Sequence, residues 1–227
     1  VKQLLDHMAY YKLNTFHWHL TDAPGWRIEI KNFPKLTTVG GIGNQSEPNA
    51  PAAYYTQEEI KEIVRYARER MIRVIPEIDM PGHATAANRA YPEHSGGGSE
   101  KYPDFTFHPA KETTYAYLSQ ILHEVDALFP SNMMHLGGDE VSFGNQMWPK
   151  DPDVLRLMEN ERLTDMKDVE DYFFERMADT LFRFNNKVLA WDEMASANLP
   201  KDKTIIFWWR HDKKEQLSLS LKMVTQQ

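Results

Sequence analysis

Cysteine is absent from the 227 residues. This excludes disulfide bonds and metal sites built on thiolates, but it does not fix the compartment, because exported bacterial proteins can also lack cysteine. No apolar run reaches the roughly 18 residues of a membrane span. A Gly-rich phosphate loop after a strand is also lacking, because "GGIGNQ" at 40–45 has no strand before it, so a dinucleotide site is not indicated.

An excess of basic residues is missing too. The chain has 26 Lys and Arg against 33 Asp and Glu, a net charge of −7. This balance argues against a nucleic-acid groove, which would carry a basic patch. Apolar residues at 41% and aromatic residues at 12% are enough for a sizeable core. The length suits one large domain or two small ones, and we expect a single domain over residues 1–227.

The two ends of the sequence indicate part of a longer protein. The chain opens "VKQLLDHMAYYKL", a helical pattern without an initiator Met, and closes "KMVTQQ", which resembles the beginning of a strand. A missing targeting signal is therefore uninformative about localisation.

Predicted helices and strands alternate along the chain. Apolar residues at helical spacing predict helices over 1–11, 56–71, 118–128 and 169–184, with a weaker helix over 212–221. Thr56 and Glu59 form a capping box at the start of the second helix. Apolar runs predict strands over 14–22, 72–80, 133–141, 187–194 and 204–209, and loops over 37–55 and 81–105. This alternation predicts a parallel sheet built from βα units.

Acids or aromatic residues stand at the end of every predicted strand. They are Asp22, Asp79 with His83 just beyond, Asp139 and Glu140, Trp191 with Asp192 and Glu193, and Trp208 with Trp209. One acid after a strand is usually a helix N-cap, but five such ends in succession favour a shared site. In a (β/α)8 barrel the carboxyl ends of the strands converge on the face that carries the active site. We therefore predict an α/β fold, a (β/α)8 TIM-type barrel that is incomplete because only five strands are predicted.

Two kinds of aromatic residue admit more than one interpretation. His17 and His135 lie within apolar strands, where a histidine is more often a hydrogen-bonded core residue than a functional one, whereas His83 follows Pro-Gly in a loop. Trp208 and Trp209 are neighbours, so one should line the pocket and the other should pack outside.

Adjacent carboxylates in "MMHLGGDEV" (133–141) carry the chemistry. Gly137 and Gly138 permit a bulge through which Asp139 and Glu140 can turn toward the same pocket. An ordinary retaining glycosidase needs two carboxyl groups about 5 Å apart across the scissile bond, which neighbouring residues provide poorly. One acid should therefore have another task than nucleophile.

The hexapeptide "HLGGDE" resembles the signature of family 20 glycoside hydrolases, the β-N-acetylhexosaminidases. The segments "FHWHLTDAPGWRIEI", "VIPEIDMPGHA", "LAWDEM" and "FWW" resemble the same family in the same order, so the resemblance covers nearly the whole chain. It implies hydrolysis of terminal N-acetylglucosamine or N-acetylgalactosamine from β-glycosides, without a cofactor or a metal. It also implies a periplasmic, secreted or lysosomal location.

The resemblance implies a role for each matching residue. The substrate's acetamido oxygen attacks the anomeric carbon, Asp139 holds the acetamido nitrogen, and Glu140 is the acid and base. For its role as acid we expect Glu140 in a dry aromatic pocket beside another negative charge. The resemblance assigns substrate binding or its support to the remaining site residues, Asp22, Asp79, His83, His135, Trp191 and Trp208.

The chain departs from the family pattern at both ends. The family's arginine on the first strand, and its residues from the seventh and eighth strands, have no counterpart here. We therefore expect little activity from residues 1–227 alone, and self-association through open barrel edges.

Two alternatives stay open at this point. His17 and His19 resemble the His-x-His pair of metal-dependent amidohydrolases, which share the barrel. The chain could also belong to a relative that binds N-acetylhexosamine without turning it over.

Overall fold

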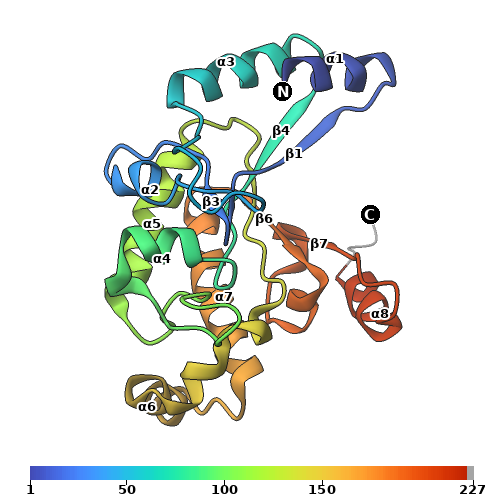
Figure 1. The fold of residues 1–227 in the computed structure, drawn as a ribbon. Coiled ribbons are helices and arrows are strands. Elements are labelled where there is room, and N and C mark those ends of the chain that lie inside the picture. Colours follow the sequence, from blue (N-terminus) through green and yellow to red (C-terminus); the bar gives the residue numbers. More distant parts are fainter. Residues whose placement is uncertain (224–227) are drawn as a thin grey trace.

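The computed structural model describes residues 1–223, so most of the strand start expected at 222–227 lies outside the described residues. Five strands form one parallel sheet (Figure 1). In sheet order they are β1 (Thr15–His19), β4 (Arg73–Glu77), β5 (Met133–His135), β6 (Lys187–Trp191) and β7 (Thr204–Phe207). Sheet order follows chain order, which is the arrangement of consecutive units in a (β/α)8 barrel.

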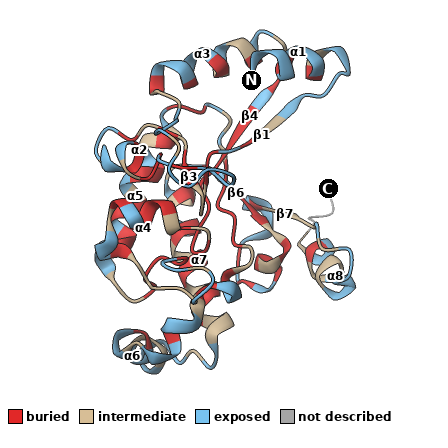
Figure 2. Ribbon diagram, viewed as in Figure 1, coloured by how far each residue is buried: buried red, intermediate tan, exposed pale blue. Residues whose placement is uncertain are grey.

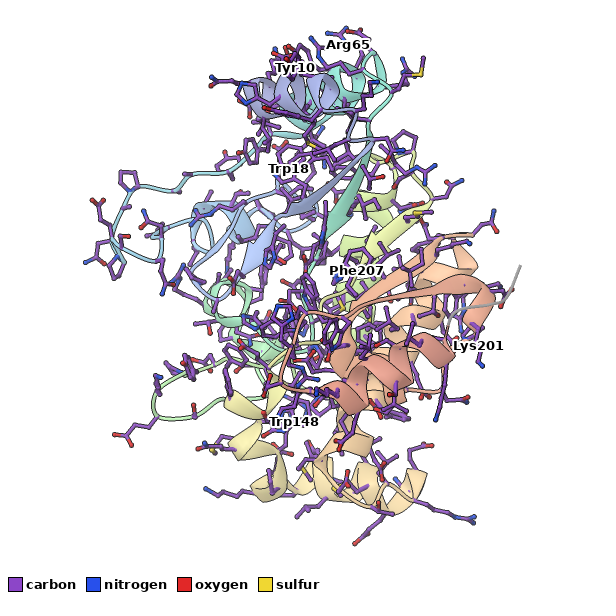
Figure 3. All side chains as sticks on the ribbon, turned by 90° about the vertical axis from the view of Figure 1, so that its right-hand side faces the viewer. Tyr10, Trp18, Arg65, Trp148, Lys201 and Phe207 are labelled. Carbon is purple, nitrogen blue, oxygen red and sulfur yellow. The ribbon has the colours of Figure 1, made fainter. Side chains whose placement is uncertain are left out.

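Helices precede, connect and follow the strands. They are α1 (Lys2–Tyr10), α2 (Lys35–Thr38), α3 (Gln57–Arg68), α4 (Thr85–Ala90), α5 (Glu112–Asp126), α6 (Pro152–Glu161), α7 (Met166–Arg183) and α8 (Lys214–Lys222). A small hairpin of β2 (Thr21–Asp22) and β3 (Gly25–Trp26) follows β1. Helices α1 and α3, which carry Tyr10 and Arg65, lie at one end of the molecule, and Trp148 lies toward the other (Figure 3).

Local signals set the ends of several elements. The predicted capping box is present at α3, where Thr56 accepts from the backbone N–H of Glu59 and the Glu59 carboxylate accepts from that of Thr56. The Asp151 side chain caps α6 and the Asp165 side chain caps α7, each by accepting from backbone N–H groups of the first turn. None of the helices in residues 1–223 is long and apolar enough to cross a membrane.

The strands alternate between an outer apolar face and an inner face. Val74, Met134, Val188 and Ala190 point outward into the main core, which also holds Leu118 of α5 and Phe173 of α7. Buried residues line the strands and the inward sides of the helices, while α6 is largely exposed (Figure 2). The inner face carries polar and aromatic side chains instead, among them His17, Glu77 and His135.

Some predicted boundaries are wrong. The segment 81–105 is not one loop, because it contains α4 and a 3-10 turn, η1 (Pro92–His94). Helix α6 was not predicted at all. The segments predicted as strands over 133–141 and 187–194 leave the sheet early, at His135 and Trp191, because the chain turns there to carry the site residues. Four further 3-10 turns are η2 (Val141–Phe143), η3 (Asn145–Lys150), η4 (Asp192–Ser196) and η5 (Lys201–Lys203).

Candidate active site

The turn after β5 places two consecutive acids on one side. Gly137 and Gly138 have φ angles of +69° and +91°, and Glu140 has +54°. A Cβ at Gly137 would collide with the Asp79 carboxylate, so glycine is required there for space as well as for conformation. This run of left-handed residues bends the chain out of the sheet, and the Asp139 and Glu140 carboxylates both turn toward the ring of His83.

His83 lies between these acids and a third one. Its Nε2 atom is 3.4 Å from Asp139 Oδ2 and 3.5 Å from Glu140 Oε2, and its Nδ1 atom is 2.7 Å from Asp22 Oδ1. Burial lowers the pKa of His83, but its contacts with Asp139 and Asp22 outweigh burial and raise that pKa to about 11. Burial raises the pKa of Asp22, but the bond from His83, the charge of His83 and the Ala23 N–H together outweigh burial and hold that pKa below its ordinary value. His83 is therefore a cation, and its Nδ1–H donates to Asp22.

Asp139 keeps one acceptor open. Its side chain is 16% exposed and that of Glu140 is 32% exposed. The Oδ1 atom of Asp139 is buried and has no hydrogen-bond partner among the described residues. A buried carboxylate oxygen without a donor is costly unless a ligand supplies one. Asp139 Oδ1 can therefore accept a hydrogen bond from an N–H or O–H group of a ligand. The more exposed carboxyl group of Glu140 lies beside it.

Asp79 lies under the site and is not exposed in it. Its side chain is almost fully buried, its backbone N–H donates to Thr21 Oγ1, and its Oδ1 accepts from the Gly138 N–H at 3.4 Å. Burial, together with the charge of Asp139, raises the pKa of Asp79 well above its usual range. Asp79 thus supports the glycine turn from below, and its expected contact with substrate stays a prediction.

Glu77 organises the inner face of the sheet. This fully buried carboxylate lies 2.7 Å from His17 Nε2, 3.1 Å from His19 Nδ1 and 3.2 Å from His135 Nδ1. It also accepts from Trp191 Nε1 at 3.0 Å. Burial raises the pKa of Glu77, but the bonds with the histidines outweigh burial and lower that pKa far below its ordinary value.

His135 is therefore a core residue, and His17, whose side chain is 24% exposed, lies beside it against Glu77. His135 is fully buried, and its ring packs against Trp191 with 4.7 Å between centroids. We named it as a substrate-binding residue, but the structure places it beneath the site, where it supports Trp191.

The metal-site alternative fits this cluster poorly. His17 and His19, the ligand pair of that alternative, fall in two different clusters: ligand atoms of His17, Glu77 and His135 lie within 4.8 Å of one another, and so do those of His19, Glu77 and Asp79. However, His17 Nε2 and Glu77 Oε2 are 2.7 Å apart, whereas two ligands of a tetrahedral zinc ion lie about 3.4 Å apart. His135 Nδ1 already lies within hydrogen-bond distance of two protein groups, the Gly137 N–H at 3.0 Å and Glu77 Oε1 at 3.2 Å. The donors are arranged to bond to one another.

A cleft of about 510 Å³ opens beside Glu140. Its wall includes Phe143, Glu193, Trp209 and Arg210. Trp208, which we had assigned to the pocket, lies elsewhere: its indole packs against His211 and its Nε1 faces Lys213 O at 3.4 Å. Trp209 takes the pocket position, 6.5 Å from Trp191 between ring centroids. One tryptophan of the pair faces the cleft, as predicted, but it is Trp209 and not Trp208.

Asp192 and Glu193, the two acids that directly follow β6, hold Trp209 and Arg210 in place. Arg210 lies 2.9 Å from the fully buried Asp192 and 3.4 Å from Glu193. Asp192 also accepts from the Trp209 backbone N–H, and Glu193 accepts from the Trp209 indole, both at 3.3 Å. Burial raises the pKa of Glu193.

Sequence reasoning missed Glu77 and Arg210, and it noted Glu193 and Trp209 at strand ends without assigning them to the site. Two of them carried a usable signal, because Glu77 precedes Asp79 by two residues and Glu193 ends a strand. Trp209 could not be separated from Trp208, because every residue from Ile205 to Trp209 is apolar. Alternation along the strand therefore does not tell which face points inward. In the structure Phe207 packs against His17, His135 and Trp191 near the middle of the molecule (Figure 3), which puts Trp209 on the same side.

Comparison with known proteins agrees with the motif. Residues 1–225 match the model for "Glycosyl hydrolase family 20, catalytic domain". The chain is 40% identical over 226 residues to a beta-hexosaminidase of Vibrio furnissii and 35% identical over 219 residues to one of Porphyromonas gingivalis. The matches cover 92% and 93% of this chain, which spans only 37% and 28% of these relatives.

Solved structures give the same picture. One is a GH20 exo beta-N-acetylglucosaminidase from Vibrio harveyi in complex with N-acetylglucosamine, with a TM-score of 0.88 and 36% identity. A beta-N-acetylhexosaminidase from Bacteroides fragilis has a TM-score of 0.84 and 41% identity. They cover 98% and 97% of this chain, and the matches span 37% and 44% of those structures. The parallel sheet and its helices are thus an incomplete α/β barrel.

Proposed function

Because the chain belongs to glycosyl hydrolase family 20, we propose that it forms the acid–base part of an enzyme that hydrolyses terminal β-linked N-acetylhexosamine residues. The observation that carries this proposal is the turn after β5. It presents Asp139 Oδ1, a buried acceptor without a partner among the described residues, directly beside the Glu140 carboxyl group. The acetamido N–H of the sugar is a donor that suits this acceptor.

The spacing of the acids favours assistance by the substrate. Adjacent residues that face the same histidine cannot stand on opposite sides of a glycosidic bond, as a nucleophile and an acid must. Family 20 is an exception to the two-carboxylate mechanism. In this family the substrate's own acetamido group is the nucleophile. Its carbonyl oxygen attacks C1, the bond from C1 to the leaving oxygen breaks, and Glu140 gives its proton to that oxygen.

The second step returns the enzyme to its starting state. Water attacks C1 of the oxazolinium ion, Glu140 takes a proton from it, and the ring opens to the acetamide. Two inversions at C1 give retention. Asp139 accepts the amide N–H while positive charge forms there, so its stabilisation is greatest in the transition state.

The surrounding residues complete the pocket. His83 places its positive charge beside Asp139 and Glu140. Asp22 fixes the orientation of the His83 ring, and its own carboxylate, 42% exposed, remains available to sugar hydroxyls. Trp191 and Trp209 supply apolar walls for the acetamido methyl group and the sugar ring.

Turnover by the full-length protein tests the proposal. We expect hydrolysis of nitrophenyl N-acetyl-β-glucosaminide with the β anomer of N-acetylglucosamine released first, as followed by NMR. Asp139→Asn should lower kcat by roughly 100-fold or more, and a thiazoline analogue of the oxazolinium ion should inhibit strongly. Asp202→Asn, an exposed acid outside the site, is the matched control. Equal rates on sugars without the acetamido group would rule out substrate assistance.

The leaving group separates the role of Glu140 from that of Asp139. A poor leaving group needs the acid, whereas nitrophenolate departs without it. Glu140→Gln should therefore nearly abolish cleavage of a disaccharide and harm the first step with nitrophenyl substrates less. Binding of N-acetylglucosamine without turnover by the parent protein would instead support a non-catalytic relative.

A further inference from the structure

Two hollows meet at one exposed ring next to the acid–base pair. The cleft of about 510 Å³ beside Glu140 and a neighbouring depression of about 410 Å³ share Ser142 and Phe143 as their common wall. Phe143 is 44% exposed, although it lies three residues from Glu140 and its backbone N–H donates to the Glu140 carbonyl at 2.9 Å. Its position relative to Glu140 is thus fixed by the same short turn, η2.

The ring of Phe143 is supported from behind. Tyr102 lies nearly parallel to it, with 5.8 Å between centroids and 15° between planes. Tyr102 packs on Phe105 at 5.6 Å, and Phe105 packs on the ring of His83 at 4.7 Å. A continuous row of rings therefore joins the exposed face of Phe143 to the cation that contacts both acids.

The loop that carries Tyr102 is held in place. The Tyr102 backbone N–H donates to Ser99 Oγ at 3.1 Å, and the Ser99 N–H donates to the Tyr102 carbonyl at 2.9 Å. Ser95 Oγ donates to Asp104 Oδ1 at 2.7 Å and closes the base of the loop. An aromatic surface that is both exposed and rigid binds a flat apolar ligand face at little entropic cost.

We propose that Phe143, backed by Tyr102, is the platform for the leaving-group sugar, so that the enzyme prefers an oligosaccharide with a neutral pyranose on the reducing side of the scissile bond. This inference rests on the proposed function. Glu140 must reach the glycosidic oxygen, so the leaving sugar has to lie on the Glu140 side of the site, where η2 begins. The apolar face of a pyranose suits the Phe143 ring, and the polar side chains of Lys101 and Gln146 in the adjoining depression suit its hydroxyl groups.

Two substrates that differ only in the leaving group test the platform in the full-length protein. One is N,N′-diacetylchitobiose, whose leaving group is a sugar, and the other is methyl N-acetyl-β-glucosaminide, whose methanol is too small to cover Phe143. We expect Phe143→Ala to lower the ratio of kcat/KM for the disaccharide to that for the methyl glycoside by roughly tenfold. Phe143→Leu should behave like Phe143→Ala, while Phe143→Trp should keep the ratio of the parent.

Controls separate the platform from other effects of the substitution. Met147→Ala removes another exposed apolar side chain, 47% exposed on η3, that lines neither hollow, and it should leave both substrates unchanged. An unchanged ratio in Phe143→Ala, or equal losses on both substrates, would overturn the platform while the proposed function stands. No turnover of either substrate by the parent protein would overturn the proposed function itself.

Discussion

The Nδ1 atom of His83 lies 2.7 Å from Oδ1 of Asp22, and this bond fixes the direction in which Nε2 points. Nε2 faces Asp139 and Glu140 at 3.4 and 3.5 Å, so the hairpin after β1 controls the charge beside the acids on the turn after β5. Three segments that are far apart in the sequence are joined by one imidazolium ring.

Removal of this cation should slow catalysis and leave the fold intact. We expect His83→Gln to lower kcat by roughly 10- to 100-fold, because the charged contact to Asp139 is lost. His123→Gln, at an exposed position on α5, should have no effect. Steady-state rates on a disaccharide and circular dichroism of each variant decide the matter, and an unchanged kcat in His83→Gln would remove His83 from the mechanism.

The same cation should make stability depend on pH. The pKa of His83 is raised from 6.5 to about 11 in the folded protein, so its contribution is complete below pH 6.5 and is lost as the pH rises toward 11. The free energy of unfolding of the parent should therefore exceed that of His83→Gln by more at about pH 6 than at about pH 9. A difference that grows with pH would show that His83 is neutral when folded.

Asp79 should also make the folded state less stable as the pH rises, so a variant that cannot ionise should be more stable at neutral pH. Burial raises its pKa above the ordinary 3.8, so the folded state loses stability as the pH rises above that value. Asp79→Asn cannot ionise, so it should raise the free energy of unfolding at pH 7 and give no gain near pH 4. Denaturant unfolding at the two pH values measures this, with Asp202→Asn as the surface control. A loss of stability at pH 7 would mean that Asp79 is ionised in the fold.

Much of this site was visible in the sequence, for a physical reason. Parallel strands bring their carboxyl ends to one edge, so Asp22, His83 and Asp139 could be placed together from strand ends alone. Glycines at 137 and 138 predicted the turn, and the structure uses both in left-handed conformations.

The other site residues could not be predicted, because the sequence does not show which face of these strands points into the site. The segments around Trp208 and His135 are apolar on both sides, so alternation does not tell which side chain enters the site. The role of Glu77 depends on partners from β1, β5 and β6, and pairing across four strands is not visible in any one of them. Helix α4 was missed because it is short and lies between loops rich in Gly and Pro.

The Asp192–Arg210 pair should be essential for stability at the end of β7. Asp192 is fully buried and Arg210 is 22% exposed, so Arg210→Met leaves a buried charge without its partner. We expect the free energy of unfolding to fall by about 3 kcal/mol. Arg65→Met on the exposed face of α3 should change it little. The double variant Arg210→Met with Asp192→Leu should recover most of the loss, and a double variant as unstable as the single one would contradict this account.

Glu77 should control the orientation of Trp191 without touching the substrate. Its two oxygens face His17, His19, His135 and Trp191, and the Trp191 indole N–H and the ring N–H groups of His17 and His19 require an acceptor. In Glu77→Gln one oxygen becomes an NH2 donor, which opposes either the indole or a histidine. We expect a loss of about 2–3 kcal/mol in stability at pH 7, a shifted tryptophan emission and a higher KM for acetamido sugars.

The pH dependence distinguishes this effect from a simple packing defect. The pKa of Glu77 is lowered from 4.5 by the histidines, so its contribution is present above pH 4.5 and is lost as the pH falls below it. The difference in stability between the parent and Glu77→Gln should therefore shrink in acid. Glu100→Gln, on an exposed loop, serves as the control for the change of charge. A difference that stays constant from pH 7 to about pH 3 would assign the loss to packing and would separate Glu77 from the charge network beneath Trp191.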